Sequence, residues 1–147
     1  ALVPKRFSFI YNEFYQPQDI FKIPFSVFAD LTLWINYIGM AEHFLAAARA
    51  VKSVNTLKNL EENLNFHNQQ ISLYSKNIEE LISTQKDISK DFIEEIHISA
   101  SNSVKNISRN IIKIYPYLGV KASQKGHPLN QVFCDYFTAT QHHIFTK

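Results

Sequence analysis

The stretch that decides the fold is NTLKNLEENLNFHNQQISLYSKNIEELIS, residues 55–83. Its core-type side chains recur at alternating intervals of three and four residues, which places them on a single helical face. This seam consists of Leu57, Leu60, Leu64, His67, Ile71, Tyr74, Ile78 and Leu81. The opposite face is charged and polar, so the pattern predicts a long amphipathic helix that packs against its neighbours at shallow angles.

The segments on either side of this stretch predict two more long helices, over residues 24–52 and 88–118. The first is apolar on two sides and therefore has to be covered on two sides. Its first stripe is Val27, Phe28, Leu31, Trp34, Ile35, Ile38, Ala41, Leu45 and Ala48, and its second is Leu33, Tyr37, Met40, Phe44, Ala47 and Val51. The seam of the other helix is Ile93, Ile96, Ala100, Val104, Ile107, Ile111 and Ile114.

A fourth helix is predicted over residues 128–145, because Pro128 suits a first turn and follows a polar connection. Residues 1–22 predict an extended aromatic arm, since Pro4 and Pro17 disfavour helix at the residues before them. Short connections near residues 53 and 85 make consecutive helices antiparallel. The expected fold is therefore all-α: one domain over residues 1–147, with the arm (1–22) preceding an up-down-up-down four-helix bundle (23–147).

Composition excludes several classes of function. The 15 Lys and Arg side chains barely outnumber the 13 Asp and Glu and are spread along the chain, so no nucleic-acid footprint is present. The lone Cys134 rules out an internal disulfide framework and, with no signal-peptide pattern, favours a cytoplasmic protein. The most apolar segment, residues 21–51, contains too many polar groups for a membrane span, so we expect no membrane partner.

Six histidines raise the possibility of a metal site, because His43, His67, His97 and either His142 or His143 fall one to a helix. A bundle interior can assemble ligands in this way. A di-iron bundle, however, needs a Glu-x-x-His unit twice, and only Glu94 with His97 supplies one. We therefore expect no metal, and histidines that are exposed or hydrogen-bonded.

The predicted fourth helix carries one polar stripe, formed by Gln131, Asp135, Thr138 and His142 at intervals of four, three and four. This spacing places the four side chains on one face, opposite the apolar stripe. A solvated face is the plain interpretation, although this one lacks Lys and Glu. Cys134 lies beside Val132 and Phe133, which favours a partly buried thiol.

The same segment resembles a known family. His127-Pro128-Leu129-Asn130-Gln131-Val132-Phe133-Cys134-Asp135, followed by Thr138-Ala139-Thr140-Gln141-His142, is similar to the closing motif of acyl-CoA dehydrogenase-like flavoproteins. The branch it resembles most includes the flavin-dependent monooxygenases, whose motif runs roughly Pro-Leu-x-Arg-x-x-Arg-Asp and then Gln-His. Val3-Pro4 with the aromatic arm resembles that family's exit from its β domain. Both motif arginines are replaced here, by Gln131 and Cys134.

The resemblance implies a larger three-domain protein with an N-terminal helical domain, a β domain and this bundle, assembled as a dimer or tetramer. It implies FAD or FMN in that parent, with no flavin held tightly by this chain alone. By the same carry-over, His142 is the candidate catalytic residue. The candidate cofactor-binding residues are Gln131, Asp135, Thr138 and Gln141.

Three hypotheses for function therefore stand. The first is the C-terminal helical domain of an acyl-CoA dehydrogenase-like flavin-dependent oxidoreductase, inactive in isolation, that provides oligomer contacts and part of the flavin and substrate cleft. The second is a non-catalytic helical interaction domain. The third is a metal-binding four-helix bundle, which requires His43, His67 and His97 to converge on one ion.

Overall fold

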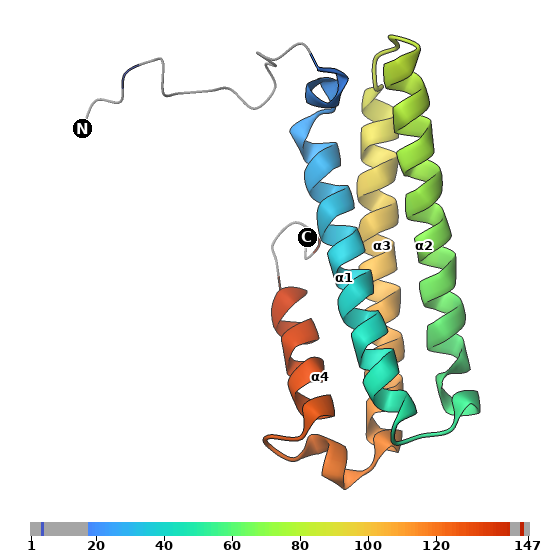
Figure 1. The fold of residues 1–147 in the computed structure, drawn as a ribbon, viewed down its shortest axis with the longest axis vertical. Coiled ribbons are helices and arrows are strands. Elements are labelled where there is room, and N and C mark those ends of the chain that lie inside the picture. The colour runs from blue at the N-terminus through green and yellow to red at the C-terminus, as the bar shows by residue number, and fades with distance from the viewer. Residues whose placement is uncertain (1–3, 5–17, 142–144, 146–147) are drawn as a thin grey trace.

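The computed structural model describes Pro4, residues 18–141 and Phe145, and its described elements are all helical. Four α-helices follow one another: α1 (Phe25–Arg49), α2 (Val54–Ser83), α3 (Lys90–Ile114) and α4 (Pro128–Ala139). Each runs antiparallel to the one before it, so the predicted four-helix bundle is confirmed (Figure 1). No helix among the described residues has the length and apolar character needed to cross a membrane.

The N-terminal arm is only partly within the described residues. Residues 1–3 and 5–17, which carry most of its aromatic side chains, lie outside them. Asp19–Lys22 form a 3-10 helix, η2, where extended chain is predicted. The Lys22 ammonium group donates to Asp19, at 2.6 Å, and to Gln85, at 2.8 Å, which ties η2 to the far end of α2. These contacts are local and tertiary, so proline spacing alone does not reveal them.

Capping residues shift the predicted helix ends by a few positions. α3 begins at Lys90 and not at residue 88, because the Ser89 side chain accepts a hydrogen bond from the Phe92 amide at 3.2 Å. It ends at Ile114, since Pro116 cannot continue an α-helix, and Tyr115–Leu118 form the 3-10 helix η3. A third 3-10 helix, η4 (Val120–Ser123), leads towards α4.

The seams predicted for α2 and α3 form the core. Every seam residue is buried except Leu81 and Ile93, which are half-buried. Trp34 of α1 lies between the two seams and is fully buried, and its indole nitrogen donates to the Ser103 hydroxyl at 2.6 Å. This bond satisfies a polar group that would otherwise be costly to bury.

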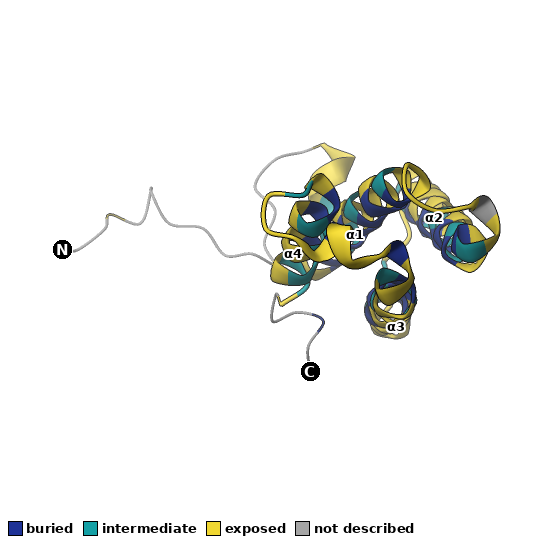
Figure 2. Cartoon of the chain, turned by 90° about the horizontal axis from the view of Figure 1, so that it is seen from below, coloured by how far each residue is buried: buried dark blue, intermediate teal, exposed yellow. Residues whose placement is uncertain are grey.

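α1 is the central helix, packed against the other three (Figure 2). α4 covers the middle of the second predicted stripe of α1, whereas Val51 at the end of that stripe is 43% exposed. The Tyr37 hydroxyl donates to the Ala139 carbonyl at 3.1 Å, and the Phe44 ring lies 6.4 Å from that of Phe133. Its first stripe is less buried than predicted, because Phe28 and Ile35 are 54% and 55% exposed. With neighbours on three sides, these two positions face outwards.

Candidate functional site on the fourth helix

α4 begins at a cap that its own sequence supplies. Pro128 occupies the first turn, where a missing amide costs nothing, and the His127 Nδ1 accepts from the Leu129 amide at 3.2 Å. Before it, Gly119 and Gly126 have φ of 90° and 88°, a conformation that side chains with a Cβ disfavour. The Asn130 amide donates to the Tyr115 hydroxyl at 3.0 Å, which fixes the first turn against η3.

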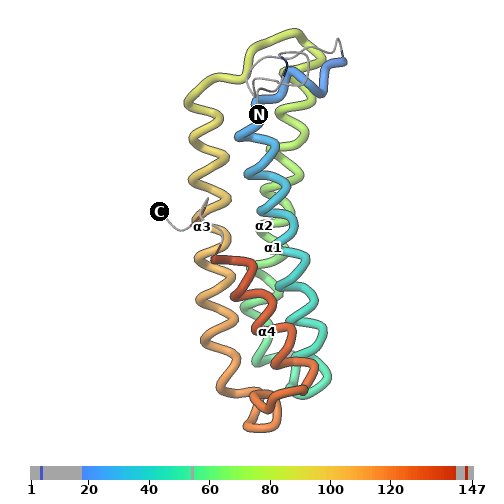
Figure 3. The backbone as a smooth tube through the Cα atoms, turned by 90° about the vertical axis from the view of Figure 1, so that its left-hand side faces the viewer, coloured from blue at the N-terminus to red at the C-terminus, as the bar shows by residue number. Residues whose placement is uncertain are grey.

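The inner side of α4 is held by aromatic packing. Leu129 and Tyr136 are fully buried, and the Phe133 ring stacks on Tyr115 with centroids 3.8 Å apart and planes 19° apart. Offset stacking of this kind adds to the stabilisation that burial alone gives. α4 therefore packs across the lower half of α1 and reaches α3 through the contact between Tyr136 and Ser108 (Figure 3).

Tyr136 contributes the most perturbed ionisable group in this interface. Its hydroxyl lies 3.0 Å from the Ser108 hydroxyl of α3, and the residue is fully buried. Burial raises the pKa of Tyr136 to about 12, because a phenolate would lose its hydration there. The phenol therefore stays neutral in the folded chain at neutral pH and acts as a hydrogen-bonding group.

The predicted polar stripe lies on the outer side of α4. Gln131, Asp135 and Thr138 are all exposed. The Gln131 amide donates to the Asp135 carboxylate at 2.8 Å, so these two side chains are brought together. What the stripe offers a bound molecule is the remaining lone pairs of Asp135, the carbonyl oxygen of Gln131 and the hydroxyl of Thr138.

The C-terminal part of the predicted site departs from the regular stripe, because α4 ends at Ala139 and not at residue 145. The Thr140 hydroxyl and the Gln141 side-chain amide both donate to the Phe137 carbonyl, at 3.4 and 3.2 Å. These side chains compete with the next backbone amides and close the helix. Gln141 is exposed in the turn that follows. His142, the candidate catalytic residue, lies outside the described residues.

The replacements of the motif arginines leave this face without a positive charge among its described residues. Gln131 is engaged with Asp135, and Cys134 is exposed, its thiol lying 4.0 Å from the Asn130 side-chain oxygen. The prediction of a partly buried thiol is therefore wrong, because the rotation of α4 directs Phe133 inwards and Cys134 outwards. A stripe of neutral groups and one carboxylate suits hydrogen-bonding partners, and lacks the fork that binds phosphate.

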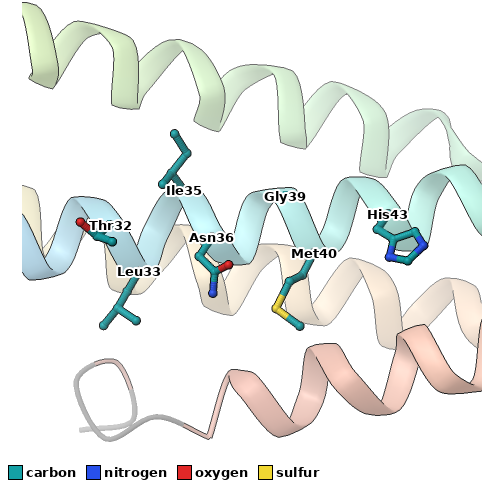
Figure 4. Close-up of a pocket in the computed structure, with 7 residues that line it drawn as sticks. All are labelled: Thr32, Leu33, Ile35, Asn36, Gly39, Met40 and His43. Carbon is teal, nitrogen blue, oxygen red and sulfur yellow. The ribbon is translucent and has the colours of Figure 1, made fainter.

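A hollow lies on the outer face of α1, between α2 and α4. It has a volume of about 590 Å³ and is lined by Thr32, Leu33, Ile35, Asn36, Gly39, Met40 and His43. Leu33 and Met40 point towards α4 and Ile35 towards α2, with Gly39 forming an open floor (Figure 4). All seven residues belong to one helix, so the hollow is a shallow, mainly apolar surface that is open to a neighbouring body.

The histidines do not form a metal site in the described part of the chain. No group of three or more His, Cys, Asp and Glu side chains with ligand geometry exists among the described residues. His43 faces the α1 hollow, and His67 is buried beside Trp34, with ring centroids 6.3 Å apart. His97 lies 3.2 Å from both carboxylate oxygens of Asp30. The three histidines that the metal hypothesis needs thus have different surroundings.

Asp30 is a residue that the sequence analysis missed. It is 4% exposed although it is a carboxylate, and burial raises its pKa, with His97 opposing that effect. The spacing of Asp30 in the sequence indicates its burial, because it follows Val27 by three residues and precedes Trp34 by four, which places it on the buried side of α1. The pairing itself joins residues on different helices, so no local pattern reveals it.

Comparison with known proteins finds similarity in the fold. No family model matches the chain, and no curated protein matches its sequence. The crystal structure of the HsaA monooxygenase from M.tuberculosis is similar with a TM-score of 0.75 and 14% sequence identity. The match covers 88% of this chain and 38% of that chain, so this chain spans well under half of the neighbour's length. At this identity the likeness shows the fold alone.

Proposed function

We propose that this chain is the C-terminal helical domain of an acyl-CoA dehydrogenase-like flavin-dependent oxidoreductase. The observation that carries the proposal is the fold match over 88% of the chain to 38% of a monooxygenase. The fold match supports the resemblance of the closing motif because the match comes from the backbone structure and the resemblance comes from the amino-acid sequence. On this proposal an N-terminal helical domain and a β domain complete the parent, and the bundle alone is inactive.

The outer stripe of α4 forms one wall of the cleft for flavin and substrate. Gln131, Asp135 and Thr138 are exposed side chains that the packing of the bundle does not require. Apart from the Asp135 carboxylate, their donors and acceptors are neutral and fit the polar edge or the hydroxyl groups of a flavin, whereas phosphate has to be held by other parts of the parent. FAD or FMN supplies the redox chemistry when bound. Gln141, exposed in the turn after α4, extends this wall, and His142 is the residue to which we assign proton exchange with the substrate.

The exposed apolar side of α1 supports the oligomer contacts in this proposal. α4 covers Tyr37 and Phe44 within the chain, so neither residue is left for a second subunit to bury. Phe25, Phe28 and Ile35 remain, each at least half exposed, beside a groove of about 260 Å³ between α1 and α2. Apolar surface gathered on one helix in this way marks an interaction site in other proteins. A dimer or tetramer of the parent would bury it.

The test of the flavin assignment uses the product of the full reading frame that encodes this chain. We expect a yellow protein with a flavin absorbance spectrum. Asp135→Asn removes one charge while preserving shape, and we expect it to weaken flavin or substrate binding about tenfold, as for a charge-assisted hydrogen bond. Glu62→Gln on α2 is the control, because Glu62 is exposed and pairs only with Lys58, at 3.5 Å. A colourless protein that binds neither FAD nor FMN contradicts the proposal.

The oligomer contacts are tested separately by sedimentation. Phe28→Glu places a charge on the exposed face of α1, and we expect it to dissociate the parent into smaller species. Leu73→Glu is the control, since Leu73 is 52% exposed on α2 and belongs to a different surface. If both variants keep the mass of the wild type, the contact does not involve α1.

The second candidate is a non-catalytic helical interaction domain, and the exposed apolar side of α1 favours it too. The flavin spectrum separates the two, because an interaction domain leaves the full product colourless. In that case Phe28→Glu still abolishes binding to the partner, whereas Asp135→Asn has no effect.

A further inference from the structure

Asp30 and His97 form an isolated polar pair between α1 and α3. Both oxygens of the Asp30 carboxylate lie 3.2 Å from the His97 Nδ1. Asp30 lies seven residues before Tyr37, the position where the end of α4 contacts α1, which is about 10 Å along the helix axis. The pair therefore sits beyond the end of α4, on a part of the α1–α3 face where the Phe145 ring lies against that of His97.

A contribution to the stability of the fold does not explain the Asp30–His97 pair. Among the described residues Asp30 has no hydrogen-bond partner besides His97, and its side chain is 6% exposed. Burying a carboxylate costs free energy that one imidazole at 3.2 Å does not fully return, which is why the pKa of Asp30 is raised. Buried ionisable groups whose charge is not fully compensated are concentrated at functional sites.

The geometry also leaves the other nitrogen of His97 available. When Nδ1 carries a proton and donates to Asp30, Nε2 is an acceptor, and it makes no hydrogen bond to a described residue. The His97 side chain is 46% exposed, so a bound molecule can reach the ring. The Phe145 ring lies 5.9 Å away at an angle of 34° and gives the imidazole an apolar neighbour.

We propose that His97, oriented by Asp30, is the proton-accepting group of a second site on the α1–α3 face, which binds a small molecule through a hydroxyl group. The ligand's O–H bond breaks and its proton forms a bond to Nε2, leaving an oxyanion on the ligand and an imidazolium on His97. The Asp30 carboxylate stabilises that imidazolium. The Asp30–His97 site does not depend on the flavin assignment, because it lies outside the stripe of α4.

The reactivity of the His97 Nε2 is measured by its rate of modification with diethylpyrocarbonate, followed at each histidine by mass spectrometry. Nε2 attacks a carbonyl carbon, an N–C bond forms, and ethyl carbonate leaves as the C–O bond breaks. His43 is the internal control, because it is exposed on α1 and makes no hydrogen bond to a described residue. We expect His97 to react about threefold faster than His43, since a carboxylate that accepts from Nδ1 orients the ring and leaves the Nε2 lone pair free to attack.

Asp30→Asn keeps the shape and a hydrogen-bond acceptor but removes the charge. We expect the rate at His97 to fall to that of His43, while the melting temperature stays the same or rises. A fall in the melting temperature without a change in rate shows that Asp30 is structural and overturns the proposal. Equal rates at His97 and His43 in the wild type overturn it too.

The class of ligand is tested with p-nitrophenol, buffered on the acid side of its own pKa, because its oxyanion is yellow. We expect the wild-type chain to increase the absorbance of the oxyanion in a saturable way, and His97→Gln to lose the increase. A His43→Gln variant controls for loss of any exposed imidazole. If the wild type and His97→Gln give the same absorbance, the site does not accept a proton from a hydroxyl group.

Discussion

The hydrogen bond between Tyr136 and Ser108 gives a sharp test of how α4 is held against α3. The two hydroxyl oxygens are 3.0 Å apart, but their surroundings differ, because Tyr136 is fully buried and Ser108 is half-buried. Removing one partner leaves the other without its bond. The cost then depends on whether water can reach the group that remains.

This difference predicts unequal effects of two small deletions. Tyr136→Phe leaves the Ser108 hydroxyl, which water can reach, so we expect a loss of about 1 kcal/mol in the free energy of unfolding. Ser108→Ala leaves the phenol hydroxyl unpaired in the core, and we expect about 2 kcal/mol. The double variant should cost less than the sum of the single variants by about 1–2 kcal/mol. Each kcal/mol corresponds to about 2–4 °C in melting temperature for a chain of this length.

Urea denaturation followed by far-ultraviolet circular dichroism measures these free energies. Ser72→Ala is the control, because the Ser72 hydroxyl is exposed and donates only to the Asn68 carbonyl, at 3.0 Å. We expect the control to stay within about 0.5 kcal/mol of the wild type. If Tyr136→Phe costs as much as Ser108→Ala, or if the two effects add, the hydroxyl groups do not form a buried bond and α4 is held by aromatic packing alone.

Three further predictions concern ionisation and backbone strain. Burial raises the pKa of Tyr136 from 10.0 to about 12, so the free energy of unfolding should fall between those pH values as the unfolded chain ionises first, and Tyr136→Phe should reduce that fall by up to about 3 kcal/mol in alkaline denaturant titrations. Burial lowers the pKa of His67 from 6.5, so stability should fall as pH drops below that value, and His67→Leu should flatten the acid side of the same profile. Gln85 has a φ of 55° after the end of α2, so Gln85→Gly should stabilise the fold by about 0.5–1 kcal/mol in urea, and a loss would show that its bond with Lys22 matters more.

The periodic parts of the fold follow directly from the sequence. The seam of α2 was predicted with His67 included, and the structure buries His67 among apolar neighbours. A spacing of three and four is a local property that tertiary contacts reinforce and do not change. The helix ends were less predictable, since Ser89, Pro116 and Thr140 each end or begin a helix through one specific contact or missing donor.

The candidate site was predictable only in part, for a physical reason. Exposure of Gln131, Asp135 and Thr138 follows from the opposite apolar stripe of α4, which is again periodic. The hydrogen-bond partners of these side chains cannot be predicted from that pattern, because the bond between Gln131 and Asp135 depends on the rotamers of both side chains. The role of His142 and the identity of any bound flavin stay predictions. Asp30 and His97 meet only after α1 and α3 have taken up their relative rotation.

The short length of α4 explains two features of α1, its buried Asp30 and its exposed apolar side chains. Twelve residues give α4 a length of about 18 Å, whereas the 25 residues of α1 extend about 37 Å. About half of the α1–α3 face therefore has no fourth helix over it. That half carries Asp30, and the neighbouring outward side of α1 carries Phe25 and Phe28, both at least half exposed. Phe145, which follows α4 in the chain, is buried beside this half with its ring 5.9 Å from that of His97, so the chain covers part of the face itself and leaves the outward apolar side of α1 exposed.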